Sequence, residues 1–239
     1  MPPSKPDHNS CANCLTRHST EWRDLDGRSL AYLDRAKRTR TVATGMNLYH
    51  QGDNADGIYC IQSGLIGLRR IDENGNSSLL STSSAGSTAG YKALLSNEPH
   101  NSSAEALVPS EICFIEKSEV RTLLAENPIL GERFLQRSLA DLDEIENSYS
   151  RSLTLNLRSR FLHLLMVYYD QSGYLDEDDQ PSVGIPISRT DLSQILGIKP
   201  ESLSRMIKKV QDEGLVKIND RHVTFTNLEE ALFEAGITL

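Results

Sequence analysis

The segment 188–213, SRTDLSQILGIKPESLSRMIKKVQDE, places apolar residues with the period of two short helices. An apolar stripe at three- and four-residue spacing marks the first helix: Leu192, Ile195 and Leu196. Ser188 precedes the stripe as a predicted N-cap, and Gly197 ends the helix. We therefore expect a short first helix followed by a tight turn, in which Ile198 can pack inward.

The second helix is predicted to begin at Pro200, because a missing N–H costs nothing at the first helical position. Its buried stripe again follows helical spacing: Leu203, Ile207 and Val210. Two short helices joined by a tight turn indicate a helix-turn-helix, whose second helix enters the major groove of DNA.

The polar edge of this second helix carries side chains that suit base recognition. Glu201, Ser204 and Arg205 fall at i, i+3 and i+4, so they share one face near the helix N-terminus. Arg can hold guanine O6 and N7 together, Glu can accept from the cytosine amino group, and Ser is permissive. The alternative is a charged helix face that only meets water. The complete set of predicted DNA contacts is Arg189, Lys199, Glu201, Ser202, Ser204, Arg205, Lys208 and Lys209.

After the two helices, GLVKINDRHVTFTN alternates apolar and polar residues on both sides of the Asn219–Asp220 turn. The apolar positions are Leu215, Val216, Ile218, Val223 and Phe225. This pattern predicts a two-stranded wing.

The front half of the chain has a different pattern, with glycines recurring through residues 40–115 between short alternating segments such as GIYCIQ, GLIGLRRI and SSLLST. Many short strands separated by turns indicate an antiparallel roll or barrel. This pattern alone indicates a small β domain and does not indicate its function.

From about Ser118 to Ser150 the chain is predicted to be helical. An apolar stripe at spacings of three and four suits one side of a two-helix seam: Leu135, Leu139, Leu142, Ile145 and Tyr149. The alternative is a helix packed on its own domain. One helix-turn-helix reads few bases and paired copies read half-sites about one DNA turn apart, so we expect a homodimer. A hinge is expected between Ser150 and Leu157, and the acidic segment DQSGYLDEDDQPSVG is predicted to be a surface loop.

The winged helix with PESLSR opening its second helix resembles the CRP/FNR family of bacterial transcription regulators. In the FNR branch the recognition helix carries Glu, Ser and Arg at the spacing of Glu201, Ser204 and Arg205. The segment 45–67 likewise resembles the cyclic-nucleotide-binding-type β-roll of this family. The resemblance implies an FNR-type inverted-repeat operator and RNA polymerase as a partner. Pro200 departs from the branched apolar residue usual at that position in FNR itself.

The resemblance implies an α+β fold: an N-terminal cyclic-nucleotide-binding-type β-roll, a long dimerisation helix and a C-terminal winged helix-turn-helix. We divide the chain into a cysteine-containing segment and sensor roll (1–117), a dimerisation helix (118–150) and a DNA-binding domain (151–239).

The overall charge looks wrong for DNA binding, because 25 Lys and Arg against 33 Asp and Glu give −8. Phosphate contacts need only a local basic patch, however. Residues 188–221 hold seven bases (Arg189, Lys199, Arg205, Lys208, Lys209, Lys217, Arg221) and five acids (Asp191, Glu201, Asp212, Glu213, Asp220), a local balance of +2. The N-terminus lacks the apolar core of a signal peptide and no apolar stretch is long enough for a bilayer, so we expect a cytoplasmic protein without membrane contact.

A CRP-like nucleotide pocket takes a Gly-Glu turn for the ribose and an Arg-Ser pair for the cyclic phosphate. By this resemblance Tyr91 stands where the Glu would be and Asn101 replaces the Arg, although Ser102 remains. A phosphate pocket without its cation is a poor one, so we do not expect cyclic AMP as the ligand. His100 and Lys92 could face another anion, but we expect both to be solvated loop residues.

Four cysteines, Cys11, Cys14, Cys60 and Cys113, match the number of thiolates that an iron–sulfur cluster uses. FNR proteins carry several N-terminal cysteines plus a late one before the dimer helix, and Cys113 matches the late position. One N-terminal cysteine is missing here, so Cys60 would have to replace it. The resemblance thus implies a 4Fe–4S cluster and regulation by oxygen or redox state.

Other uses of these residues remain open. Cys11, Cys14 and His18 could bind zinc, the C-x2-C pair could be a dithiol switch, and Cys60 and Cys113 also look like inert buried thiols. Haem, with His50 or His163, is a lesser alternative. We expect no enzyme, because no nucleophile elbow, phosphate loop or zinc-protease motif is present. A thiol redox enzyme or a protein-binding module without DNA reading are the alternatives of another class.

Overall fold

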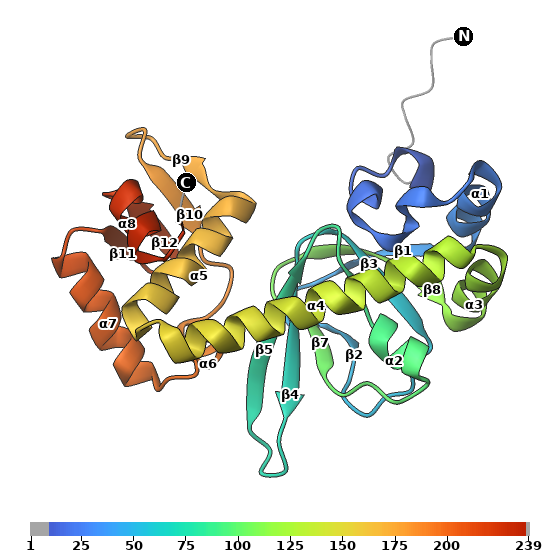
Figure 1. Cartoon of the computed structure of the whole chain (residues 1–239), viewed down its shortest axis with the longest axis horizontal. Coiled ribbons are helices and arrows are strands. Elements are labelled where there is room, and N and C mark those ends of the chain that lie inside the picture. The colour runs from blue at the N-terminus through green and yellow to red at the C-terminus, as the bar shows by residue number, and fades with distance from the viewer. Residues whose placement is uncertain (1–9, 238–239) are drawn as a thin grey trace, which may run out of the picture. The chain divides into compact units, whose positions relative to one another are not determined.

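The computed structural model describes residues 10–237, which form two compact units, one ending at Asp143 and the other beginning at Glu144 (Figure 1). Helix α4 (Pro128–Thr154) runs across this boundary. Within residues 10–237, no helix is long and apolar enough to span a membrane.

The N-terminal unit is a β-roll with helices on one side. Three short 3-10 helices and one α-helix come first: η1 (Cys11–Asn13), η2 (Arg17–Ser19), η3 (Glu21–Asp24) and α1 (Gly27–Ala36). The strands are β1 (Arg38–Val42), β2 (Asn47–Tyr49), β3 (Gly57–Ser63), β4 (Leu65–Ile71), β5 (Ser77–Ser84), β6 (Thr88–Ala89), β7 (Ser103–Ala106) and β8 (Ser110–Glu116), with α2 (Tyr91–Ser96) after β6. They pair as two antiparallel sheets, in the orders β1-β8-β3-β6 and β2-β7-β4-β5. The predicted β-roll is thereby confirmed.

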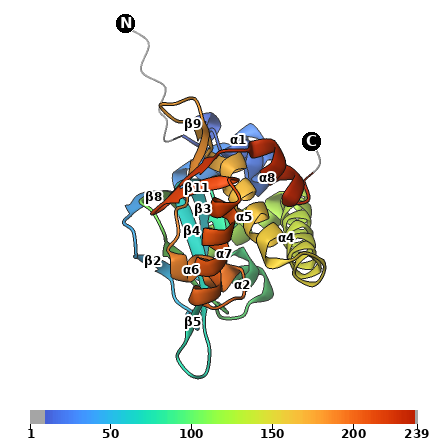
Figure 2. The same ribbon diagram turned by 90° about the vertical axis from the view of Figure 1, so that its left-hand side faces the viewer.

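The turns of the roll explain its glycines. Gly64, between β3 and β4, has φ +96°, and a Cβ there would lie 2.1 Å from Ser110 Oγ. The left-handed conformation and the close approach both require glycine. Beyond this turn, β4 and β5 form a long hairpin that projects from the roll (Figures 1 and 2).

Strand β3 is buried on both faces, and its successive side chains enter two different cores. Tyr59 and Ile61 belong to the core between the two sheets. Ile58 and Cys60 belong to a second core, outside the roll, together with residues of η3, α1, α2, α3 (Lys117–Glu126) and α4. Side chains alternate between the faces of a strand, so Cys60 lies under the helical layer.

The segment from about Ser118 to Ser150 is not the single helix that its sequence predicts. It forms α3 and α4, which are separated at Asn127. Pro128 begins the second helix, and the residue before a proline is pushed out of the helical region, which explains the break. Helix α4 ends at Thr154 and α5 (Leu157–Ser172) follows, so the expected break falls at residues 155–156.

The C-terminal unit contains the predicted winged helix. Helices α6 (Arg189–Ile195) and α7 (Pro200–Asp212) are followed by β11 (Val216–Asn219), β12 (His222–Phe225) and α8 (Leu228–Glu234). The wing is wider than expected, because β9 (Tyr174–Leu175) and β10 (Pro181–Gly184) complete a four-stranded sheet in the order β11-β12-β10-β9. The acidic segment is therefore a hairpin rather than only a loop, and its Ser182 and Val183 are buried.

Candidate functional site

The helix-turn-helix forms with the residues predicted for it. Ser188 Oγ caps α6 by accepting from the N–H of Asp191 at 3.1 Å. Gly197 has φ +66°, a conformation that glycine adopts without strain, and Pro200 occupies the first turn of α7. The predicted stripe of α7, Leu203, Ile207 and Val210, is buried. Met206, which the sequence analysis did not assign to it, is also buried at 7% exposure. These contacts fix one face of α7 against its own unit.

Glu201, Ser204 and Arg205 lie exposed on the N-terminal half of α7. Ser204 Oγ donates to the carbonyl of Pro200 at 3.1 Å, and Arg205 Nε to that of Glu201 at 3.4 Å. Both bonds are to the same helix, so they leave the side chains on the solvent side of α7. Figure 2 shows α7 and α6 within the C-terminal unit.

The other predicted DNA contacts surround these three residues. Arg189, Lys199, Lys208 and Lys209 are exposed, and Ser202 is half-buried. Lys209 Nζ lies 3.9 Å from Glu213 Oε1, so its charge is partly balanced within the helix. An open groove beside α7 is lined by Ser202, Arg205 and Lys209 and by the start of α5.

Arg158, which the sequence did not single out, ties α7 to the rest of its unit. Its Nε donates to Glu213 Oε2 at 2.8 Å at the end of α7, and its Nη1 pairs with Glu234 of α8. A single guanidinium thus joins α5, α7 and α8. These contacts hold the C-terminal end of α7 beside α5 and α8.

The four cysteines, far apart in sequence, line one pocket of the N-terminal unit (the cysteine pocket). Cys11 and Cys14 come from η1 and its C-cap, Cys60 from β3 and Cys113 from β8. Cys11, Cys60 and Cys113 are buried and Cys14 is half-buried; all four are free. His18, a zinc ligand only in the alternative interpretation of the cysteines, is exposed and does not line the pocket.

The thiols have separate hydrogen-bond partners. Trp22 Nε1 donates to Cys60 Sγ at 3.1 Å, Cys113 Sγ lies 3.4 Å from Thr39 Oγ1, and Cys14 Sγ lies 3.3 Å from Thr16 Oγ1. In the described part of the chain, no three His, Cys, Asp or Glu side chains come close enough to hold a metal ion. The four cysteines therefore share a pocket without forming a preassembled metal centre.

Burial keeps the deepest thiols protonated at neutral pH. It raises the pKa of Cys11 to about 11 and also raises the pKa values of Cys60 and Cys113. Lys37 Nζ, whose side chain is 7% exposed, pairs with Asp34 at 2.8 Å beside Cys11. Burial alone would lower the pKa of Lys37, but Asp34 and Cys11 outweigh it and raise the pKa. Lys37 is therefore protonated beside the pocket, as one half of an ion pair with Asp34.

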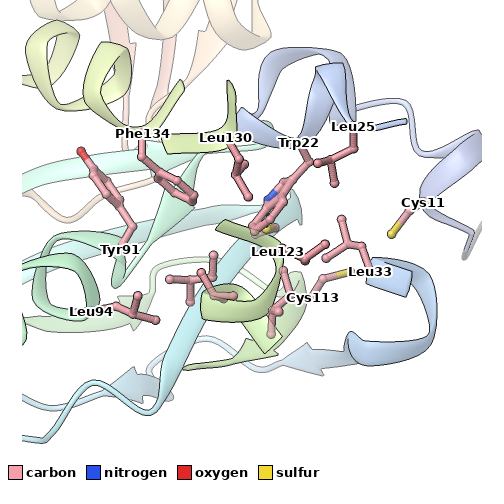
Figure 3. Packing of buried hydrophobic residues seen from close by; sticks show 14 of the residues in the cluster. Cys11, Trp22, Leu25, Leu33, Tyr91, Leu94, Cys113, Leu123, Leu130 and Phe134 are labelled. Carbon is pink, nitrogen blue, oxygen red and sulfur yellow. The ribbon is translucent and has the colours of Figure 1, made fainter. Parts of the chain in front are cut away.

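Trp22, the single tryptophan of the chain, connects the cysteine pocket to α4. Its ring meets Phe134 of α4 edge-on at 5.7 Å between centroids, and both side chains are almost fully buried (Figure 3). Its neighbours in η3 also contact α4: Asp24 pairs with Arg133, and Glu21 lies 3.9 Å from Arg137. Trp22 was not singled out from the sequence. The signal that could have found it is a lone tryptophan shortly after the C-x2-C pair.

The positions compared with a nucleotide pocket have other partners. Tyr91 is buried and its hydroxyl donates to Asp141 of α4 at 2.7 Å, while Lys92 Nζ lies 2.9 Å from the same carboxylate. His100 was expected to be solvated, but it is 5% exposed and stacked on Tyr49 at 3.6 Å between ring centroids. Burial lowers its pKa, so it offers no firm positive charge. Ser102 is buried and Asn101 exposed.

The predicted stripe on α4 is exposed to solvent. Its members are 49–67% exposed, and Leu153 continues the row at 69%. The stripe therefore does not pack against the chain's own domain, whereas α4 does so through another side, as the alternative prediction of a helix packed on its own domain expects. The buried side of α4 is instead formed by Leu130 and Phe134.

Comparison with known proteins assigns both halves of the chain. Residues 39–127 match the cyclic nucleotide-binding domain family, and residues 159–230 match the Crp-like helix-turn-helix domain family. The transcriptional regulatory protein btr of Bordetella pertussis is 28% identical over 233 residues, covering 95% of this chain and 93% of its own. The fumarate and nitrate reduction regulatory protein of Vibrio cholerae is 24% identical, covering 95% and 91%. The solved structure of FixK2 from Bradyrhizobium japonicum has the same fold, with a TM-score of 0.73 and 15% identity over 85% of this chain and 99% of that one.

A nucleotide-binding-type roll and a winged helix with an exposed second helix define a DNA-binding transcription regulator. Both matched domains and the regulators aligned along nearly the whole chain agree on this class. The chain belongs to the CRP/FNR family.

Proposed function

We propose that this protein binds an inverted-repeat operator as a homodimer and that its cysteine pocket makes binding depend on oxygen or redox state. The exposed edge of α7 carries the DNA part of the proposal: Glu201, Ser204 and Arg205. These side chains sit at the end of the helix that meets base edges in helix-turn-helix complexes. Arg205 would hold a guanine, Glu201 would accept from a cytosine amino group, and Ser204 would support both.

The lysines and arginines around α7 would provide affinity rather than sequence choice. Lys208 and Lys209 lie further along the helix, where phosphates pass, and Arg189 and Lys199 flank the turn. Phosphate contacts position a protein on the duplex without reading its sequence. The net balance of +2 in residues 188–221 supports this despite the total charge of −8.

The stripe on α4 supports the homodimer. Apolar side chains at three- and four-residue spacing, each about half exposed or more, form a seam that a second copy of the same helix would cover. Two recognition helices held by one seam would read two half-sites about one DNA turn apart. Because the chain belongs to the CRP/FNR family of transcription regulators, the dimer would act together with RNA polymerase.

The cysteine pocket supports a 4Fe–4S cluster as the sensing group. The four thiols fit in kind and number, because such clusters are held by four Cys thiolates, and all four line one pocket. A bound cluster would supply an oxidant-sensitive group whose loss changes charge and packing at the pocket. Lys37 would balance the negative charge of thiolate ligands, and Trp22 would keep Cys60 oriented through its indole N–H.

The same residues offer a route from the pocket to the dimer helix. Trp22 touches Cys60 on one side and Phe134 of α4 on the other, while Asp24 and Glu21 face Arg133 and Arg137 one turn apart. A change at Cys60 would move η3, and η3 is bound to α4 by three neighbouring contacts. Dimer geometry and operator affinity would follow from the position of α4.

The test is the visible absorption spectrum and iron content of the protein purified without oxygen. We expect a brown protein with iron and sulfide, and loss of both in Cys14→Ser and in Cys113→Ser with operator binding reduced in each. An iron-free colourless protein, or unchanged operator binding in both variants, would contradict the sensing proposal. Haem gives a distinct visible spectrum, so the same measurement separates that alternative.

A further inference from the structure

Cys60 and Cys113 face each other across neighbouring strands. They are direct partners in the antiparallel register of β3 and β8, and both belong to the core outside the roll. Both also line the cysteine pocket. Their side chains therefore point to the same face of the sheet, toward the same space.

The register sets the distance between strands β3 and β8 at this pair. Just beyond these strands, the N–H of Lys117 donates to the carbonyl of Asp56 at 2.8 Å. Hydrogen-bonded pairs recur at every second residue of an antiparallel ladder, so the Cys60–Cys113 pair is also a hydrogen-bonded one. In agreement, the N–H of Ile61 points away from β8 and donates to Ser87 at 2.9 Å.

This position suits a covalent link. Cα atoms in a hydrogen-bonded antiparallel pair lie about 5.5 Å apart. Disulfides most often join residues whose Cα atoms are about 5.5 to 6 Å apart. The Cα spacing of the Cys60–Cys113 pair is therefore within the range found in disulfides.

We propose that Cys60 and Cys113 form a reversible cross-strand disulfide when the pocket holds no metal group and the protein meets a peroxide. The inference rests on the proposed function only in that it concerns the same pocket. One thiol loses its proton as its sulfur attacks a peroxide oxygen, the O–O bond breaks, and the departing hydroxide takes up that proton, so a sulfenic acid and one water result. The second sulfur then attacks the sulfenic sulfur, the S–S bond forms, the S–O bond breaks and a second water leaves. Two thiols are oxidised and one hydrogen peroxide is reduced to two waters.

Access and reversibility both follow from the surroundings of the pair. Cys14, Thr16 and Arg17 line the same pocket and are partly exposed, so they mark the side from which a peroxide would reach the pair. Opposed Cβ atoms in a sheet are about 4.5 to 5.5 Å apart, whereas a disulfide brings them to about 3.5 to 4.5 Å. The strands must therefore close slightly, and the resulting strain makes the bond easier to reduce. Oxidation would withdraw two of the four thiols from the pocket until a reductant restores them.

The experiment treats the reduced full-length protein, freed of metal by a chelator, with hydrogen peroxide and then blocks remaining thiols by alkylation. Trypsin separates the cysteines well: residues 1–17 carry Cys11 and Cys14, residues 41–69 carry Cys60, and residues 93–117 carry Cys113. We expect free thiols to fall from four to two and mass spectrometry to show peptide 41–69 joined to peptide 93–117. Dithiothreitol should return all four. A link within peptide 1–17 instead, or sulfinic acids with no link, would overturn the inference.

Variants separate this pair from the other cysteines. Cys60→Ser and Cys113→Ser should each abolish the joined peptide, whereas Cys11→Ala, which removes another buried thiol of the same pocket, should leave it at the wild-type yield. Circular dichroism of each variant checks that the roll is folded. A joined peptide that vanishes in folded Cys11→Ala would contradict a direct reaction between the cross-strand partners.

Failure of this inference is distinguishable from failure of the proposed function. If anaerobic protein carries iron and sulfide but peroxide leaves no joined peptide, only the disulfide inference is wrong. If the joined peptide forms but reduced protein never takes up iron and sulfide, only the cluster proposal is wrong. Where both hold, oxidised protein should fail to take up iron and sulfide until it has been reduced.

Discussion

Arg205 is the side chain on which base discrimination is expected to depend most. It is exposed on α7, next to the turn that begins the helix. Arg205→Ala should cost about 1 to 3 kcal/mol of discrimination at one guanine, because a bidentate contact to that base is lost. Fluorescence anisotropy with operators changed at single positions measures this.

Lys208→Ala is the matched control, because it removes an exposed cation from the same helix. It should weaken binding to every sequence by a similar factor and lower the salt dependence by about one phosphate contact. Equal behaviour of the two variants toward all operators would show that Arg205 reads no base.

Asp141 gives a second residue-scale prediction, for stability. Its carboxylate accepts from Tyr91 and lies near Lys92 and Arg137. Burial alone would raise its pKa, but these partners outweigh burial and lower it. A folded pKa below the unfolded value contributes stability that is present above the unfolded pKa and lost as pH falls through the folded one. Urea unfolding should therefore show Asp141→Asn to be less stable than wild type at pH 7, with the difference shrinking below about pH 4. A difference that is independent of pH would rule out a role for the charge.

At the scale of elements, α4 carries the prediction on assembly. Leu142 lies in its exposed apolar stripe, and Asn147 lies on another face of the same helix. Leu142→Glu should raise the dimer dissociation constant roughly tenfold or more, because an unpaired charge in an apolar seam is costly. Asn147→Glu adds the same charge and should change little. Sedimentation equilibrium measures both, and equal effects would argue against this seam.

Some elements were predictable because their signals are local. Gly197 and Pro200 set the turn of the helix-turn-helix, and the buried stripe of α7 followed from helical spacing. The break before α4 was missed although Pro128 signals it, because the apolar stripe begins only at Leu135 and says nothing of where its helix starts. The hairpin of β9 and β10 was missed because strands of two and four residues are too short for a periodic pattern.

The cysteine pocket shows what sequence spacing could not give. That Cys113 lies opposite Cys60 depends on the register between strands about fifty residues apart. That Cys11 reaches them depends on η1 packing against α1, where Asp34 accepts from the N–H of Cys11 at 2.8 Å. Four cysteines could be counted from the sequence, but their common pocket is a product of the fold. Likewise the burial of His100 on Tyr49 arises from packing inside the roll.

At the scale of the whole molecule, the cysteine pocket lies in one unit and the exposed edge of α7 in the other, and α4 runs across the boundary between the two units. We propose that the state of the four cysteines controls operator affinity. The most direct measurement follows visible absorbance and operator anisotropy together while air is admitted to anaerobic protein bound to labelled inverted-repeat DNA. We expect absorbance and bound fraction to fall together, and Arg205→Ala to lose absorbance at the wild-type rate although it binds weakly throughout. Bleaching of the absorbance with no change in the wild-type bound fraction would contradict it.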